Sequence, residues 1–296
     1  MVSRTSRRHP PMALPRLLRT AVSAEKVLQM TGTHRGPSFS ITLAVSLAVA
    51  FGIGTGSSRP NAQAAVHVLR VVVLGDSGAS GSGDPTGLAW GGRYGRLLRR
   101  KLGAKVVVTN LAREGKSSTV QLDELHSDPV TRTAVTNADI ILFGSTAGAN
   151  LNEADAKLAA KACKGESCYA SALRAWARDY GRIVSTAVAL RGTRKTVLRG
   201  VTEPNVVPGA QGVMPPFATV ELGLFQAKLI KQTVCATMVA HRGRCIDVLA
   251  AFNGPSGKRD AYKSGLLNKI DCCYASGKGQ QLIAELLLKT GVKPSN

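Results

Sequence analysis

The chain has 296 residues, of which 44% are hydrophobic and 19% charged, and 39 Lys and Arg against 18 Asp and Glu give a formal net charge of +21. This much apolar material excludes a disordered, highly charged chain. Aromatic residues make up only 4%, which argues against a base-stacking nucleic-acid platform, and the 31 glycines and 13 prolines lack the periodicity of collagen or of a repeat array.

Residues 1–64 have the pattern of a secretory signal. Basic residues precede an apolar run, Ile41–Gly54, and Asn61-Ala62-Gln63-Ala64 supplies a small-x-small cleavage site. The run has about 14 residues, whereas a membrane-spanning helix needs roughly 20. An uncleaved anchor is the alternative. We therefore expect a secreted or cell-envelope-associated protein in which residues 65–296 form a single domain.

Positive charge persists after this segment is removed. Residues 1–64 hold eight of the basic residues and one acidic residue, which leaves 31 and 17 and a net charge of +14. This balance favours an anionic cell-envelope surface as partner, or serves only solubility. No DNA-binding motif occurs, so we expect no nucleic acid as partner, and we expect a monomer.

Six cysteines in an exported chain can form up to three disulfides. They allow 15 pairings, among which the sequence cannot choose. Proximity favours Cys163–Cys168 and Cys235–Cys245, which leaves the adjacent Cys272 and Cys273 to each other unless pairs cross between groups. No Cys-x-x-Cys pair occurs, so we expect no zinc site.

The mature chain alternates apolar strands with amphipathic helices, which predicts a parallel sheet covered by helices on both faces. The five predicted strands are Val68–Leu74, Lys105–Thr109, Asp139–Phe143, Thr196–Val201 and Cys245–Leu249. The predicted helices are Thr86–Leu102, Ser171–Leu190, Thr219–His241 and Gly279–Thr290.

Open parallel sheets bind ligands beyond the carboxyl ends of their strands. The first predicted strand ends in Gly75-Asp76-Ser77-Gly78, a tight turn that presents the Ser77 hydroxyl at this edge. Phosphate-binding glycine loops have other spacings, which are absent here. Ser77 could instead be merely a turn or cap residue.

A strand followed by Gly-Asp-Ser resembles the first block of the SGNH, or GDSL, hydrolases. Asn110–Gly115 resembles the second block and Gly148-Ala149-Asn150 the third, although Asn150 lies about two residues further along than usual. The resemblance covers roughly residues 68–290. It implies a three-layer α/β/α sandwich with a five-stranded parallel sheet, and an oxyanion hole formed by Ser77, Gly115 and Asn150. Gly115 could instead only satisfy a positive φ, and Asn150 could be a helix cap.

The last block departs from the family. Asp-x-x-His becomes Asp271-Cys272-Cys273-Tyr274, so Tyr274 stands at the position of the catalytic base. Tyrosine has a reference pKa of about 10 and is mainly a proton donor at neutral pH. Three explanations stay open. The protein binds a ligand but is catalytically impaired, another base such as His67, His126 or His241 substitutes, or Tyr274 or Asp271 acts directly. Asp271 could also be only a turn residue.

Together these features predict a serine ester hydrolase without metal or organic cofactor. The resemblance implies lipid, acyl-sugar or cell-wall esters as substrates, with Ser77, Asp271 and Tyr274 as catalytic residues. The alternative is a non-catalytic binding module for an acylated or anionic cell-envelope polymer.

Overall fold

The computed structural model describes residues 68–210, 213–270 and 273–293. Its elements in chain order are β1 (Val68–Leu74), α1 (Ser77–Ser80), α2 (Ala89–Leu102), β2 (Lys105–Asn110), α3 (Ser118–Ser127), α4 (Pro129–Asn137), β3 (Ile140–Phe143), α5 (Gly148–Ala159), α6 (Glu166–Arg191), β4 (Val197–Val201), α7 (Val220–Ala240), β5 (Arg244–Ile246), α8 (Val248–Asn253) and α9 (Gly277–Lys289). Within these residues, no helix combines the length and the apolar character that crossing a bilayer requires.

The strands form one parallel sheet in the order β2-β1-β3-β4-β5. Val71 of β1 pairs with Ile140 of β3, and Ile140 pairs with Val197 of β4. Val71–Leu74 of β1 and the whole of β3 are buried and apolar, as both faces of a covered parallel sheet require. The predicted fold class, an α/β sandwich with five parallel strands, is confirmed.

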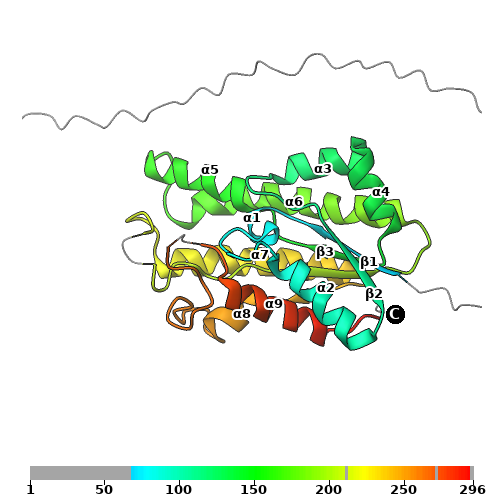
Figure 1. The fold of residues 1–296 in the computed structure, drawn as a ribbon. Helices are drawn as coiled ribbons and strands as arrows, with labels where there is room; N and C mark the ends of the chain where they lie inside the picture. Colours follow the sequence, from blue (N-terminus) through cyan, green and yellow to red (C-terminus); the bar gives the residue numbers. More distant parts are fainter. Residues whose placement is uncertain (1–67, 211–212, 271–272, 294–296) are drawn as a thin grey trace, which may run out of the picture. The chain divides into compact units, whose positions relative to one another are not determined.

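Two cores form because side chains alternate between the faces of the sheet. Val72 and Leu74 pack into a core shared with α3, α4, α5, α6 and α7. Val71 and Val73 pack into the opposite core with α2, α8 and α9. Figure 1 shows α3, α4, α5 and α6 on one side of the sheet and α2, α8 and α9 on the other. This arrangement leaves the two edges at the strand ends open.

Most predicted elements are confirmed within a few residues, but three boundaries were wrong. The helix predicted from Ser171 begins five residues earlier, at Glu166. The fifth strand ends at Ile246 rather than Leu249, because the Asp247 carboxylate caps α8 by accepting a hydrogen bond from Ala250 N at 3.0 Å. The helix predicted from Thr86 begins at Ala89, because Thr86 lies in a turn. The backbone N–H of Thr86 donates a hydrogen bond to Asp84 Oδ1 at 3.0 Å. The short helices α1, α3, α4, α5 and α8 had not been predicted.

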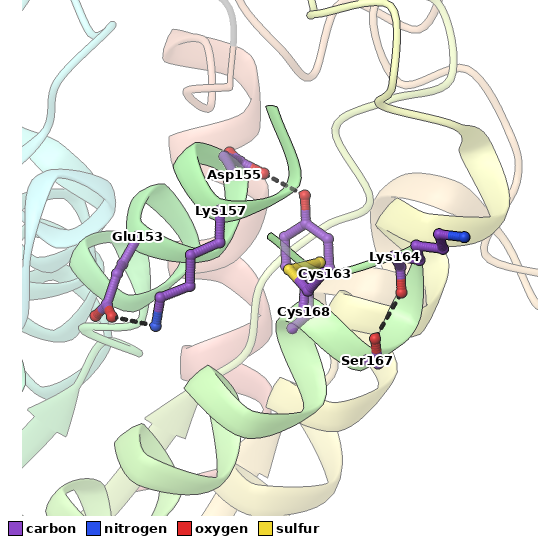
Figure 2. The surroundings of a disulfide bond; sticks show 8 residues. Glu153, Asp155, Lys157, Cys163, Lys164, Ser167 and Cys168 are labelled. Atoms are coloured by element: carbon purple, nitrogen blue, oxygen red, sulfur yellow. Dashed lines mark hydrogen bonds and ion pairs between the residues drawn. A yellow bond between two sulfur atoms is a disulfide. The ribbon is translucent and has the colours of Figure 1, made fainter. Parts of the chain in front are cut away.

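Both disulfides favoured by proximity are confirmed. Cys163–Cys168 closes the connection between α5 and α6, and Cys235–Cys245 joins α7 to β5. Figure 2 shows the first of these beside Asp155 of α5. Cys272 lies outside the described residues, so the third pairing stays a prediction.

Two further predictions concern residues that lie outside the described part of the chain. One is the signal sequence over residues 1–64, with the domain boundary at residue 65. The other is the catalytic role assigned to Asp271.

Candidate functional site

The turn after β1 is built to hold Ser77 at the carboxyl end of the sheet. Asp76 caps α1, with its Oδ1 accepting a hydrogen bond from Gly78 N at 3.2 Å. Ser77 is therefore the first residue of α1. Gly75 has a φ of +154°, and a β-carbon there would lie 2.6 Å from Ala79 Cβ and 3.2 Å from Gly144 Cα. Only glycine allows the turns after β1 and β3 to approach this closely.

Ser77 is half-buried and lines a cavity of about 240 Å³. Its neighbours in the wall come from the loops after β1, β3 and β4, from α5 and α7, and from the segment before α9. The lining residues are Asp76, Ser77, Gly78, Ser145, Ala147, Gly148, Leu151, Asn152, Asp155, Glu203, Pro204, Val206, Met214, Gly223, Gln226, Ala227, Ile230, Cys273 and Tyr274. Among the residues that the structure describes, none donates a hydrogen bond to, or accepts one from, Ser77 Oγ.

Two carboxyl groups lie next to Gly78, the residue after Ser77. Asp76 Oδ1 and Glu203 Oε1 each lie 3.7 Å from the position that a β-carbon on Gly78 would take. Glu203 follows β4, so the sheet order brings it to the same edge as Asp76. Its Oε1 accepts a hydrogen bond from Ser145 Oγ at 2.7 Å. The site therefore holds an interacting pair of carboxyls next to its hydroxyl.

The two carboxyls have different surroundings. Burial raises the pKa of Glu203 to about 7, the Asp76 carboxylate adds to this rise, and the hydrogen bond from Ser145 opposes it. Burial also raises the pKa of Asp76, but the backbone N–H groups of Gly148 and Gly78 oppose it. Because Asp76 accepts these two backbone hydrogen bonds, at 3.4 and 3.2 Å, the negative charge is better held there and the proton resides on Glu203.

Tyr274 lines the same cavity as Ser77, so the structure brings these two predicted residues together. The glycine-rich turn and the segment before α9 touch at Gly83. A β-carbon on Gly83 would lie 2.6 Å from Tyr274 Cβ, and Asn268 Nδ2 donates a hydrogen bond to Gly83 O at 3.3 Å. The position of Tyr274 thus depends on the turn that carries Ser77.

Gly115 does not line the cavity. It is exposed, has a φ of +70°, and no atom lies within 4 Å of where its β-carbon would be. The loop around it is held by the buried Lys116, whose Nζ donates to Leu111 O and pairs with Glu124. A positive φ alone accounts for glycine at this position. The role of Gly115 as a hydrogen-bond donor to the oxyanion stays a prediction.

Asn150 is half-buried in the first turn of α5 and is also absent from the cavity wall, whereas the next two residues, Leu151 and Asn152, line it. It is not the cap of α5, because Ala147 occupies that position. Directly after β3 stand Gly144, Ser145 and Thr146, of which Ser145 lines the cavity. The oxyanion part of Asn150 stays a prediction.

No histidine of the described chain lines the cavity. His126 is exposed on α3. His241 follows α7, and its Nε2 lies 3.2 Å from Ser185 Oγ, within hydrogen-bond distance. His67 falls outside the described residues. Neither described histidine is therefore placed to act on Ser77.

Glu203 was not predicted from the sequence, although its position after a strand fits the rule used for the other site residues. Functional residues were expected after every strand, including the one that ends at Val201, yet no residue beyond Val201 was nominated. Glu203 is the second residue after that strand. A carboxylate directly after an apolar strand was the available signal.

A third carboxyl, Asp155 of α5, completes the polar part of the cavity. It accepts a hydrogen bond from the hydroxyl of Tyr169, the residue after Cys168 in the sequence. Figure 2 shows this hydrogen bond as a dashed line at Asp155. Burial raises the pKa of Asp155, and the hydrogen bond from Tyr169 opposes the rise. The described wall thus contains three carboxyls and no Lys, Arg or His.

Solved structures similar to this chain are hydrolases. The lipase Lip_vut3 from a goat rumen metagenome is 20% identical over 77% of this chain and 100% of its own, with a TM-score of 0.63. A GDSL-like lipase candidate from Parabacteroides merdae is 12% identical over 77% and 99%, with a TM-score of 0.53. The acetylxylan esterase Axe2 from Geobacillus stearothermophilus is 14% identical over 75% and 93%, with a TM-score of 0.50.

No protein-family model and no curated protein matches the sequence. At these identities the likeness to solved structures concerns the arrangement of the sheet and its helices. On that arrangement, the chain has the fold of the SGNH hydrolases.

Proposed function

We propose that this protein is an SGNH-type serine hydrolase that cleaves a carboxylic ester. The observation that carries the proposal is the placement of Ser77 at the carboxyl end of β1, in the wall of a cavity that it shares with Glu203 and Tyr274. The three residues come from distant parts of the sequence. A hydroxyl, a carboxyl of raised pKa and a phenol in one cavity are the groups that acyl transfer needs.

In this mechanism Ser77 Oγ attacks the ester carbonyl carbon while its proton passes to the Glu203 carboxylate. The tetrahedral intermediate collapses to an acyl-serine, and the alcohol leaves with the proton that Glu203 had taken. Water then attacks the acyl group while Glu203 takes a proton from it, and Glu203 returns this proton to Ser77 Oγ as the acid leaves. A pKa of about 7 makes Glu203 nearly as good a base as histidine, whose reference value is about 6.5.

The negative oxygen of the intermediate needs hydrogen-bond donors. The family resemblance assigns this part to Ser77 N–H, Gly115 N–H and the Asn150 amide, and we retain that assignment as part of the proposal. Since neither Gly115 nor Asn150 lines the cavity, both would have to reach the oxyanion with substrate bound.

Tyr274 fits the part of a proton donor, because a phenol is protonated at neutral pH. We propose that its hydroxyl donates a hydrogen bond to the oxygen of the leaving alcohol, while Glu203 supplies the proton. Asp271 would support Tyr274 from three residues earlier in the chain, as the corresponding aspartate supports histidine in the family.

A second candidate function is a non-catalytic module that binds an acylated cell-envelope polymer. One observation favours it, namely that no histidine of the described chain lines the cavity. The two disulfides fit export to an oxidising compartment, which both candidate functions share. Neither candidate requires a metal or an organic cofactor.

The deciding experiment measures hydrolysis of short-chain p-nitrophenyl esters by the purified protein, its Ser77→Ala variant and its Ser82→Ala variant. Ser82 lies in the same glycine-rich turn but not in the cavity wall. We expect turnover that Ser77→Ala abolishes and Ser82→Ala retains, and labelling of Ser77 by a serine-reactive phosphonate. Absence of turnover and of labelling, together with retained binding of an acylated polymer, would establish the binding module instead.

A further inference from the structure

Exposed positive charge gathers at the amino ends of the strands, opposite the cavity. We name this surface the basic edge. It comprises eleven exposed side chains at strand starts, at helix ends and in the loops that join them: Arg70, Arg99, Arg100, Lys101, Lys105, Arg194, Lys195, Arg242, Arg244, Lys289 and Lys293. Figure 1 shows the ends of α2 and α9 beside the starts of β1 and β2.

Acidic residues barely offset this charge. In the described loops that join the elements at the basic edge, Asp139 is the one acidic residue, and its carboxylate accepts a hydrogen bond from Arg70 N at 2.7 Å. Glu285 lies one turn before Lys289 on α9. None of the seven ion pairs between described residues involves a side chain of the basic edge. Most of the net charge of residues 65–296 therefore lies on one side of the molecule.

Helix capping does not account for the pattern. Cations are stabilised near helix C-termini, which explains basic residues in the last turns of α2 and α9. Arg70, Lys105 and Arg244 lie in strands, however, and Arg194 and Lys195 lie in a loop. The charge extends across the whole sheet from β2 to β5, about 20 Å at the usual strand spacing. An extended anionic surface matches this shape.

Two exposed apolar side chains belong to the same edge. Leu102, the last residue of α2, is 41% exposed, and Val239, near the end of α7, is 73% exposed. They flank the basic residues at opposite ends of the sheet. Apolar side chains among basic residues are typical of surfaces that rest on lipid headgroups, whereas a hydrophilic polymer offers them nothing to bury against.

The path of the chain also favours a membrane. β1 starts at the basic edge with Val68, and the apolar run Ile41–Gly54 is separated from it by the thirteen residues 55–67. Thirteen extended residues reach about 45 Å at most. In the uncleaved alternative, an amino-terminal segment held in the membrane would be tethered to the edge that carries the charge.

We propose that the basic edge docks on a bilayer that contains anionic phospholipids. Arginine and lysine side chains contact the headgroup phosphates, and Leu102 and Val239 enter the interface. Because the cavity lies at the carboxyl ends of the strands, docking in this orientation leaves its mouth facing away from the membrane.

The test compares partition of the full chain into phosphatidylcholine vesicles with and without phosphatidylglycerol. Arg100→Glu, Lys101→Glu and Lys105→Glu are combined in one variant, because no hydrogen bond within the described chain involves their side chains. The matched control reverses Lys164, Arg174 and Arg178, which are equally exposed on or beside α6. Binding to vesicles without phosphatidylglycerol measures what the rest of the chain contributes.

Each basic residue close to an anionic membrane contributes roughly a fivefold gain in partition. We expect the edge variant to lose about 100-fold of its phosphatidylglycerol-dependent partition and the control to lose less than about threefold. A third variant, Leu102→Gln with Val239→Gln, should weaken vesicle binding while leaving binding to soluble polyphosphate unchanged. Equal losses in the edge variant and the control, or no effect of the third variant on vesicles, would overturn the proposal.

Discussion

The carboxyl groups of Asp76 and Glu203, which are 127 positions apart in the sequence, both lie next to Gly78. An oxygen of each is 3.7 Å from the position of a β-carbon on that residue. The negative charge of Asp76 adds to the effect of burial in raising the pKa of Glu203, so the two carboxyls do not both ionise readily and one of them keeps its proton to unusually high pH. Backbone N–H groups donate hydrogen bonds to Asp76 and stabilise its negative charge, so Glu203 is the carboxyl that keeps the proton.

The first prediction concerns the pH dependence of hydrolysis. A base must be ionised to accept a proton, so kcat/KM should rise with pH through about 7, the pKa of Glu203. Glu203→Gln should lower kcat/KM by roughly 10²- to 10⁴-fold and remove this rise. Ester hydrolysis measured between about pH 5 and pH 9 checks both effects.

Asp155→Asn is the matched control, because Asp155 lines the same cavity but bonds to Tyr169. This variant should keep the rise near pH 7. If Glu203→Gln retained the full rate and the same profile, Glu203 would not be the base.

The second prediction concerns stability. Glu203 has a pKa of about 7 in the folded protein and 4.5 as its reference value, so the folded state binds its proton more tightly than the unfolded state does. The associated stability is fully present below about pH 4.5 and is lost as the pH rises through about 7. Glu203→Gln should therefore be more stable than the parent by about 3 kcal/mol at alkaline pH. Below about pH 4.5 the difference should vanish.

Urea unfolding at acid and alkaline pH measures this difference. A constant gap between variant and parent at every pH would show that Glu203 is not responsible for it.

The third prediction tests the contact between the glycine-rich turn and Tyr274. Gly83→Ala places a β-carbon 2.6 Å from Tyr274 Cβ and should displace the tyrosine, lowering both stability and hydrolysis. Gly87→Ala is the control, because Gly87 also has a positive φ but no atom lies within 4 Å of its β-carbon position. Both variants incur the backbone strain, about 1 kcal/mol. Gly83→Ala should cost about 1–3 kcal/mol more, because it also forces atoms into contact. Equal thermal midpoints and rates for the two variants would contradict the contact.

The fourth prediction concerns substrate charge. The described cavity wall has three carboxyls and no basic side chain, although the protein as a whole is strongly basic. A neutral ester should therefore be preferred over the same ester bearing a carboxylate by at least about tenfold in kcat/KM, since like charges in a half-buried site repel. Asp155→Asn should reduce the preference for the neutral ester, because it removes one of the three carboxyls. A higher kcat/KM for the anionic ester would contradict this prediction.

The fifth prediction concerns the disulfide between α7 and β5. Cys235 and Cys245 are ten positions apart, and their crosslink restricts the unfolded chain. Replacing both by alanine should lower the free energy of unfolding by about 2–3 kcal/mol. Denaturant titration measures the loss, and the parent treated with reductant should show the same trend. A variant as stable as the oxidised parent would contradict this role.

Local pattern was sufficient for much of the fold. The strand Val68–Leu74 is rich in valine and is followed by glycine, and the helix over Val220–Ala240 is long, so the positions of both follow from composition and period. The turn that carries Ser77 could be predicted from Gly75, because the backbone there comes so close to Gly144 that only glycine fits. Element boundaries set by a side-chain cap, such as the one at Asp247, were harder to predict from the sequence, because a cap depends on the geometry of a single hydrogen bond.

The amino-acid sequence by itself determined an α/β chain with Ser77 at a strand end, and its resemblance to the SGNH hydrolases implied that Tyr274 stands where their histidine does. Only the tertiary structure decided that Glu203 and Asp76 share one site and that the basic side chains collect on the opposite edge. The reason is that pKa values and surface charge depend on which residues are close in space. In a parallel sheet ordered β2-β1-β3-β4-β5, those neighbours come from segments far apart along the chain.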